Sequence, residues 1–151
     1  MDSFLSQTGE YALRATAWLA LLSSEEPVRA RDLAEHSGVP GHYLSKILRR
    51  LVLAGILKSQ KGKAGGFVLA HLPSAISFKD VLVAVDAFPV TGRCAFGWGA
   101  CNADSPCPLH GPSTAINEEF RNWAANTTFA ELGSLSRSGQ RRHDMSGGGA
   151  W

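Results

Sequence analysis

The 151-residue sequence lacks the features of several common protein classes. No apolar run approaches the roughly 18–20 residues that a membrane-spanning helix needs. The first residues, Met-Asp-Ser-Phe, contain neither the charged segment nor the apolar segment of a secretory signal peptide. We therefore expect a cytoplasmic protein with no membrane partner, in a compartment where thiols stay reduced.

Cysteine is scarce, and its spacing argues against two common arrangements. The chain has only three cysteines, Cys94, Cys101 and Cys107, and they share one glycine-rich loop. The set does not suit a disulfide framework, and zinc knuckles usually pair cysteines two to four residues apart. With His110 close behind, the loop instead offers three thiolates and an imidazole. These ligands suit a metal ion or an iron–sulfur cluster.

Acidic residues are missing from a long central segment. Between His36 and Phe78 there is no Asp or Glu, although the segment contains six lysines and arginines. A cluster of one charge sign is expected where a protein contacts nucleic-acid phosphates, but a basic run can also be a solvated face. The segment also has the pattern of a helix-turn-helix, described below, and this pattern favours contact with DNA.

Apolar spacing and turn residues predict a mainly α protein with a small β-hairpin (α+β). Helices are expected over residues 8–23, 30–37 and 41–54, from 77 and from 113, with strands over 56–60 and 67–70. Ser77–Asp80 and Thr128–Glu131 have the pattern of helix capping boxes. The expected division is a DNA-binding domain over 1–87, a metal-binding loop over 88–112, a dimerisation helix and terminal turn over 113–133, and a disordered tail over 134–151.

Residues 30–54 have the pattern of a helix-turn-helix. The first helix needs a small residue where the second crosses it, and Ala34 is there. The turn four places later needs a residue that tolerates positive φ, and Gly38 provides it. The hairpin that follows makes the motif a winged helix-turn-helix. Ten residues are expected at the DNA: Pro40, Gly41, His42, Tyr43, Ser45, Lys46, Arg49, Arg50, Lys61 and Lys63.

These residues have different expected roles. Those from Pro40 to Lys46 begin the recognition helix and would approach bases and nearby phosphates in the major groove. Tyr43 is equally consistent with a packing role. Arg49 and Arg50 lie further along, where contact with the DNA backbone or pairing within the protein is expected. Lys61 and Lys63, on the wing, would position the protein without reading sequence.

Several further motifs make the chain resemble the Rrf2 family of winged-helix transcriptional regulators, which has IscR-like and NsrR-like branches. The resemblance spans about residues 5–134 and includes the three cysteines. The other motifs are Glu10-Tyr11-Ala12-Leu13-Arg14, Tyr43-Leu44, Lys61-Gly62-Lys63-Ala64-Gly65-Gly66-Phe67, Val81-Leu82-Val83-Ala84-Val85-Asp86 and Thr127-Thr128-Phe129-Ala130-Glu131-Leu132.

The resemblance implies a homodimeric regulator, expected to be a repressor, that binds a palindromic operator in double-stranded DNA. Ile116, Phe120 and Trp123 on the helix from Ser113 would contact the partner subunit, unless they form an intrachain core. An iron–sulfur cluster sensing iron, redox state or nitric oxide would control DNA affinity.

The family's cluster ligands correspond to Cys94, Cys101 and Cys107. His110 matches the fourth ligand of the IscR-like branch, and Glu10 of the partner subunit matches that of the NsrR-like branch. We favour His110 because it is local and imidazole suits iron. We favour [2Fe-2S] over [4Fe-4S], although the six-residue gap between the first two cysteines matches neither branch.

Alternative interpretations keep the DNA-binding function but change the role of the cysteines. A Cys3His zinc site in a constitutive repressor and a thiol switch without a cluster both remain open. An enzyme with Cys107 as nucleophile and His110 as base is not expected, because nothing in the sequence resembles an oxyanion hole or a third orienting group.

Overall fold

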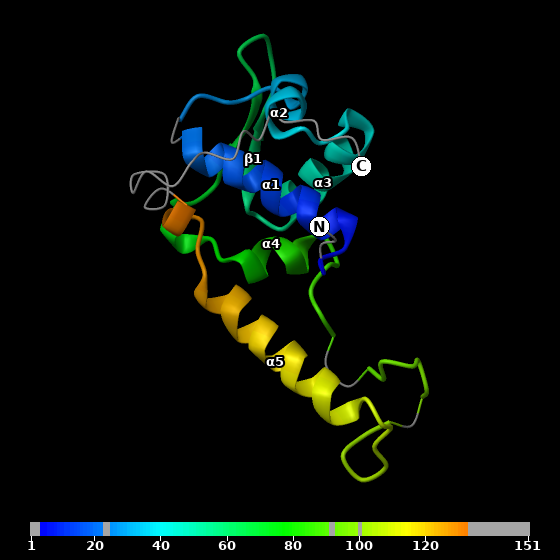
Figure 1. The fold of residues 1–151 in the computed structure, drawn as a ribbon. Helices are drawn as coiled ribbons and strands as arrows, with labels where there is room; N and C mark the ends of the chain where they lie inside the picture. Colours follow the sequence, from blue (N-terminus) through cyan, green and yellow to red (C-terminus); the bar gives the residue numbers. More distant parts are fainter. Residues whose placement is uncertain (1–3, 23–24, 91–92, 100, 133–151) are drawn as a thin grey trace.

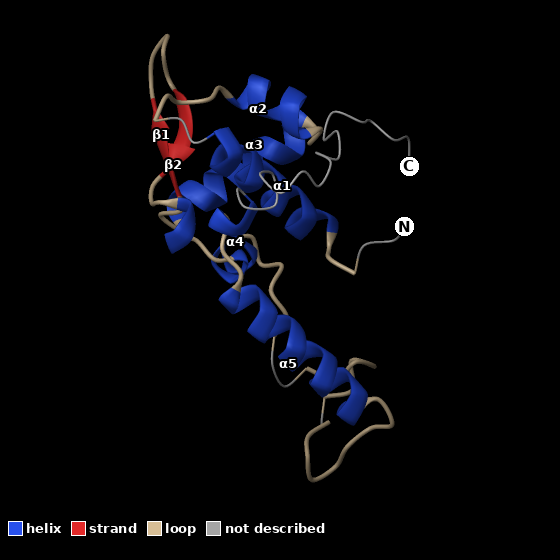
Figure 2. Cartoon of the chain, turned by 60° about the vertical axis from the view of Figure 1, so that its left-hand side comes forward, coloured by secondary structure: helices blue, strands red, loops and turns tan. Residues whose placement is uncertain are grey.

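The computed structural model describes residues 4–22, 25–90, 93–99 and 101–132. In chain order the elements are α1 (Gln7–Leu22), α2 (Ala30–Ser37), α3 (Gly41–Leu53), β1 (Leu57–Gln60), β2 (Gly66–Leu69), a 3-10 turn η1 (Pro73–Ala75), α4 (Phe78–Ala84) and α5 (His110–Asn126). Helices α1 to α4 and the hairpin form one body, and α5 projects away from it (Figures 1 and 2). The mainly helical fold with a small hairpin is confirmed.

The core of the body lies between α1, α3 and α4. Small residues on α1, such as the fully buried Ala12 and Ala15, allow the other two helices to approach closely. The hydroxyl of Thr16, which is also buried, donates to the carbonyl of Ala12 at 2.8 Å. On α3 the buried residues are Leu44, Ile47, Leu48 and Leu51. Burying each such side chain contributes about 1.5–3 kcal/mol, so this face fixes the orientation of α3.

The hairpin is attached to the body by a third extended segment. Strands β1 and β2 are antiparallel, with Leu57 opposite Leu69 and Gln60 opposite Gly66. Val28, just before α2, forms a bridge with Phe67 through two backbone hydrogen bonds of 2.9 and 2.7 Å. The next residue, Arg29, donates from its guanidinium to the carbonyl of Lys63 near the hairpin tip. The wing is therefore tied to the segment that leads into α2.

The chain returns to the body after α5. The backbone N–H of Phe78 donates to the carbonyl of Thr127, and the N–H of Phe129 donates to that of Ile76. The side chain of Phe129 is 1% exposed and packs against Phe78 with ring centroids 4.7 Å apart. Of the two predicted capping boxes, the first is complete and the second shows one of its two hydrogen bonds. Ser77 and Asp80 form a complete capping box, and Glu131 Oε1 accepts from the N–H of Thr128.

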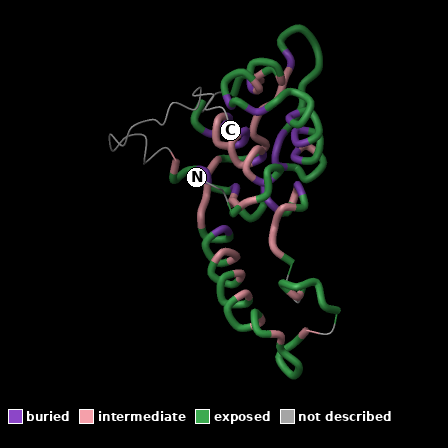
Figure 3. The backbone as a smooth tube through the Cα atoms, turned by 45° about the vertical axis from the view of Figure 1, so that its right-hand side comes forward, coloured by how far each residue is buried: buried purple, intermediate pink, exposed green. Residues whose placement is uncertain are grey.

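Helix α5 differs from the other helices because it is hardly buried. Only Ala124 of its 17 residues is buried, and Figure 3 shows the rest of the helix as exposed or intermediate. The helix starts at His110, three residues before the predicted start at Ser113. The prediction was wrong because Pro112 suggested a loop. Proline is tolerated in the first helical turn, where its missing N–H has no helical partner.

The other predicted boundaries agree with the structure to within about a residue, which is the usual uncertainty of element ends. The predicted tail over residues 134–151 and the last residue of the predicted first helix, Ser23, lie outside the described residues. Among the helices that the structure describes, none combines the length and hydropathy needed to cross a bilayer.

Candidate DNA interface and metal centre

The turn between α2 and α3 has the geometry that the helix-turn-helix pattern predicts. Gly38 caps α2 in the left-handed region, with φ 66° and ψ 19°. Ala34 is partly buried and packs against the core, as expected for the small residue at a close helix crossing. Leu33 and Val39, on either side of the turn, are buried. The turn therefore sets the angle between α2 and α3.

The structure exposes the residues predicted to face DNA. On α3 the buried and exposed positions alternate with helical periodicity, so the predicted residues share the outward side. Lys61 and Lys63 are exposed at the hairpin tip. All ten positions are therefore exposed to solvent, and their contact with DNA stays a prediction.

Two of the predicted DNA contacts on α3 also have side-chain partners on other elements of the chain. The ring of Tyr43 packs on Tyr11 of α1 with centroids 5.8 Å apart, and it remains 42% exposed. Arg50 donates from Nη1 to the carbonyl of Val85 at 3.0 Å and to Asp86 Oδ2 at 3.2 Å. For Arg50 the sequence suggested contact with the DNA backbone or pairing within the protein. Pairing within the protein is observed, and contact with DNA stays a prediction.

Three short turns fold the cysteine loop. The N–H of Gly97, which has φ 73°, donates to the carbonyl of Cys94 at 2.9 Å. Between the second and third cysteines, Asn102 Oδ1 accepts from the N–H groups of Asp104 and Ser105 at 3.0 and 2.9 Å. The third turn joins the carbonyl of Cys107 to the N–H of His110 at 3.0 Å. Long spacings in sequence therefore become short distances in space.

These turns bring the predicted ligands together at the far end of α5. The sulfur atoms of Cys94, Cys101 and Cys107 all lie within 4.8 Å of one another. The distance is 3.8 Å between the sulfurs of Cys94 and Cys107, and 3.2 Å between Cys101 Sγ and Nδ1 of His110. Three sulfurs and one imidazole converge, which is a set of donors that a thiophilic metal would bind.

The distances fit one metal ion closely. Bonds of about 2.3 Å at tetrahedral angles separate neighbouring sulfurs by about 3.8 Å. In a [2Fe-2S] cluster each iron takes two terminal ligands, so two donors on one iron lie about as close as at a single ion, and only donors on different irons lie further apart. The donor types fit both kinds of centre, and the cysteine loop would have to open to admit a cluster.

The three thiols do not have equal acidity. Burial, the largest single effect, raises the pKa of the Cys94 thiol. Hydrogen bonds from the backbone of Phe96 and Trp98 and from the neighbouring thiols outweigh it, so the pKa of Cys94 lies below its ordinary value. Burial and then the proximity of the other two thiols raise the pKa of Cys107. Neighbouring thiolates repel one another, so the group of three thiols loses its first proton preferentially from Cys94. A bound cation would favour deprotonation of the other two thiols.

Glu10, the alternative fourth ligand, lies on α1 in the body. Its carboxylate forms an ion pair with Arg14 one turn later on the same helix. Within the described residues of a single chain, only His110 of the two candidates contacts a cysteine sulfur. A role for Glu10 would therefore require a second subunit.

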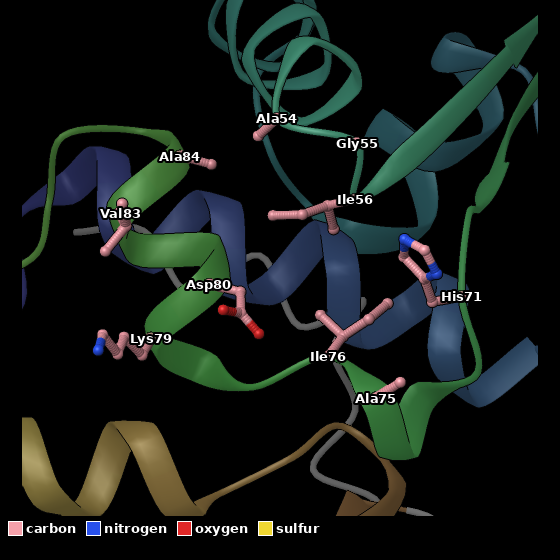
Figure 4. A pocket seen from close by; sticks show the side chains of 10 residues that line it. All are labelled: Ala54, Gly55, Ile56, His71, Ala75, Ile76, Lys79, Asp80, Val83 and Ala84. Carbon is pink, nitrogen blue, oxygen red and sulfur yellow. The ribbon is translucent and has the colours of Figure 1, made fainter.

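Another cleft lies between the end of α3, η1 and α4 (Figure 4). It has a volume of about 420 Å³, and its apolar lining includes Ile56, Ile76 and Val83. The carboxylate of Asp80 at its edge already accepts from Ser77, so it is engaged in helix capping. None of the predicted site residues lines this cleft.

Sequence reasoning missed three residues that position the site. Arg29 holds the wing tip, Arg121 of α5 donates to the carbonyl of Pro89 at 2.7 Å, and Asp86 pairs with Arg50. Each bond joins residues more than 30 positions apart, so the local pattern does not indicate which residues pair. A single sequence therefore gives no signal that would identify them.

Comparison with known proteins gives consistent results. Residues 5–134 match the family model described as Rrf2, iron-dependent transcriptional regulator. The chain is 32% identical over 128 residues to the HTH-type transcriptional regulator IscR of Klebsiella pneumoniae, covering 85% of this chain and 78% of that protein. The corresponding regulator of Yersinia pestis is 33% identical over 85% of this chain and 77% of its own length.

Solved structures share the fold. CymR of B. subtilis, described as a global cysteine regulator, superposes with a TM-score of 0.71 at 26% identity, over 89% of this chain and 98% of that one. IscR of T. potens superposes with a TM-score of 0.67 at 24% identity, over 93% of each chain. With a family match over most of its length and a winged helix-turn-helix of the expected geometry, the chain belongs to the Rrf2 family of DNA-binding transcriptional regulators.

Proposed function

We propose that this regulator binds a palindromic operator as a homodimer and that a metal centre at Cys94, Cys101, Cys107 and His110 controls its affinity. The observation that carries the proposal is the convergence of four donor atoms from a 17-residue segment, next to a winged helix-turn-helix. The IscR relatives and the iron-dependent family description support iron as the metal. We propose an iron–sulfur cluster, with [2Fe-2S] preferred.

The DNA-binding role belongs to residues 1–87. Helix α3 would enter the major groove with the residues from Pro40 to Lys46, while Lys61 and Lys63 contact phosphates beside it. Arg49, exposed on the same helix, would reach the DNA backbone. Electrostatic attraction would be strong, because no acidic residue lies between His36 and Phe78.

The dimer would form through α5. Ile116 is 69% exposed and Trp123 is 42% exposed, although both are large apolar residues on one helix. Phe120, the third predicted contact, is partly covered within the chain by Phe4 and Phe88. A helix that buries so little of itself gains little stability from its own chain, and a second copy of α5 would cover its apolar side.

A bound cluster would respond chemically to iron supply, oxidation or nitric oxide. The chain's own contribution is to fold the loop before α5 around the ligands. With four ligands tied to one centre, the residues from Cys94 to His110 would lose freedom, and the spacing of the two recognition helices would change with them.

A mononuclear Cys3His zinc site is the second candidate, and the approach of all three sulfurs to within 4.8 Å of one another, with His110 beside them, supports it. The test is anaerobic isolation, followed by iron, sulfide and zinc determination and an absorption spectrum. Iron with sulfide and visible colour would support the cluster. Colourless protein with one zinc per chain would establish the alternative, and metal-free protein with a disulfide would indicate a thiol switch.

The regulatory part of the proposal needs a second experiment. An operator selected in vitro from random duplexes should bind the loaded protein and the metal-free protein with different affinities. Cys101→Ala should abolish the colour and this difference together. Unchanged colour and an unchanged difference in the variant would remove the sensor role.

A further inference from the structure

Residues 85–90, here called the connecting segment, link α4 to the cysteine loop. At its start the guanidinium of Arg50, on the recognition helix α3, holds the segment through two groups. Nη1 donates to the carbonyl of Val85 at 3.0 Å and to Asp86 Oδ2 at 3.2 Å. The connecting segment is therefore bonded directly to the helix that is expected to read DNA.

The backbone bends sharply at this point. Asp86 has φ 56° and is the one non-glycine residue with positive φ among those that the structure describes. Aspartate tolerates this conformation better than most residues do. The bend continues with a hydrogen bond of 2.8 Å from the N–H of Ala87 to the carbonyl of Leu82. A Cβ placed on Gly9 of α1 would lie 3.0 Å from Cβ of Ala87, so the bend packs tightly on α1.

At the other end the same segment is held by α5. Arg121 donates from Nη1 to the carbonyl of Pro89 at 2.7 Å, and its guanidinium lies 4.9 Å from the ring centroid of Phe88. The Phe88 ring also packs against Phe120 of α5, with centroids 6.1 Å apart. Two arginines, one on α3 and one on α5, thus hold the two ends of this short segment.

The pair of Arg50 and Asp86 is poorly suited to stabilise the fold. The side chains are 48% and 85% exposed, and exposed ion pairs contribute little to stability. The geometry of the pair suggests a positioning role, because one guanidinium binds a main-chain carbonyl and a carboxylate from successive residues and so fixes where that backbone lies relative to α3. The side chain of the adjacent Arg49 is exposed and has no hydrogen bond or ion pair in the part of the chain that the structure describes, so it provides a natural comparison.

We propose that Arg50 is a positioning residue, which with Asp86 and the Val85 carbonyl transmits the arrangement of the cysteine loop to the recognition helix. The path runs from α5 through Arg121 to the connecting segment, and from the segment through Arg50 to α3. This inference rests on the proposed metal-dependent DNA binding. It assigns to Arg50 a role in regulation in place of a phosphate contact.

The test compares the affinity of the full-length protein for the selected operator in its metal-loaded and metal-free forms. Arg50→Lys keeps the positive charge, but its single nitrogen lies about one bond closer to the backbone, so it would not reach the two acceptors of Nη1 without a shift of the connecting segment. Asp86→Asn keeps a residue that tolerates positive φ while removing the charge. Both should reduce the loaded-to-free affinity ratio by about fivefold, which is the lower range of allosteric coupling. The salt dependence of binding and the thermal unfolding midpoint should stay as in the wild type.

Arg49→Gln is the matched control from the same helix. It should weaken binding equally in both forms and reduce the salt dependence, because Arg49 is free to contact a phosphate. If Arg50→Lys and Asp86→Asn keep the full ratio, the inference is overturned. The inference is also overturned if Arg50→Gln behaves as Arg49→Gln does, with a lower salt dependence of binding and an unchanged loaded-to-free affinity ratio.

The wild type distinguishes this failure from a failure of the proposed function. A wild-type ratio of one would refute metal-dependent regulation and the inference with it, whereas a normal wild-type ratio retained by both variants would refute the inference alone. Should Asp86→Asn fail to fold, Arg50→Lys decides the question by itself, since its side chain is half exposed on a helix that the core holds independently.

Discussion

The rings of Tyr43 on the recognition helix and Tyr11 on α1 pack in an edge-to-face arrangement, with centroids 5.8 Å apart and the rings inclined by 61°. Tyr11 is in turn covered by the guanidinium of Arg14 at 5.6 Å. The exposed side of α3 is therefore supported by α1. Packing of Tyr43 is observed, and its contact with DNA stays a prediction for the 42% of the residue that is exposed.

Removing that support should weaken DNA binding without altering the DNA-facing surface. We expect Tyr11→Ala to lower the free energy of unfolding by about 2 kcal/mol, because it removes apolar burial and an aromatic pair, and to lower operator affinity at temperatures where the protein stays folded. Tyr11→Phe is the control. It removes only the exposed hydrogen bond from Gln7, so its stability should change by less than about 0.5 kcal/mol. Equal affinity for all three proteins would show that α1 does not position Tyr43.

The fourth ligand can be identified by substitution at two positions. His110→Ala should alter the absorption spectrum and weaken metal retention by more than the roughly tenfold that removal of an outer-shell partner costs. Glu10→Gln should leave both unchanged, because its carboxylate pairs with Arg14 in the same chain. The opposite result would place Glu10 of a second subunit at the metal and would leave His110 as a helix-terminal residue.

The pH dependence of thiol reactivity follows from the unequal pKa values. Because the pKa of Cys94 lies below the ordinary thiol value and that of Cys107 lies above it, Cys94 becomes thiolate first as the pH rises. Thiolates are the reactive form, so iodoacetamide should label Cys94 before Cys107 in reduced, metal-free protein near neutral pH. Peptide mass spectrometry over time measures the order. Indistinguishable rates at every pH would contradict the assigned acidities.

Attachment of the wing depends on one close backbone approach. Gly66 has φ 152°, and a Cβ there would lie 2.4 Å from the carbonyl oxygen of Val28. Gly66→Ala should therefore break the bridge between Val28 and Phe67, costing about 1–3 kcal/mol and reducing operator affinity. Gly62→Ala is the matched control, because Gly62 also has positive φ but has open space around it. Denaturant unfolding should show a clearly smaller destabilisation for the control.

The exposed lysines of the wing should contribute through charge. Replacing Lys61 and Lys63 by alanine should reduce the slope of log affinity against log salt by about 0.9 for each phosphate that is no longer neutralised. Sequence preference in a repeated selection should stay the same, since interactions with phosphates carry no base information. A slope as steep as that of the wild type would mean that the wing does not touch DNA.

The sequence allowed local features to be predicted wherever a local rule determined them. Ala34 and Gly38 predicted the helix crossing and its left-handed turn, and Ser77 with Asp80 predicted the start of α4. In both cases the determining residues lie within four positions of one another. The start of α5 was misjudged because Pro112 is compatible with a loop and with a first helical turn, and the local sequence does not separate the two.

Relationships between distant segments could not be predicted in this way. The cysteine spacing indicated which residues could bind metal, but it could not show that Asn102 folds the gap between Cys101 and Cys107 or that their sulfurs lie so close together. The bond of Arg50 to Asp86 and that of Arg121 to Pro89 depend on packing between helices. A single sequence contains no periodicity that reports such pairs.

The burial of Phe129 has a mechanical consequence for α5. Because the chain re-enters the body immediately after Asn126, the helix is clamped at its carboxyl end while its other end carries the ligands (Figure 1). Its 17 residues, at a rise of about 1.5 Å each, make a lever arm of about 25 Å. A tilt of about 5° about the carboxyl end of α5 displaces its amino end by roughly 2 Å. Conversely, a displacement of about 2 Å at the cysteine sulfurs corresponds to a rotation of the body relative to α5 by only about 5°.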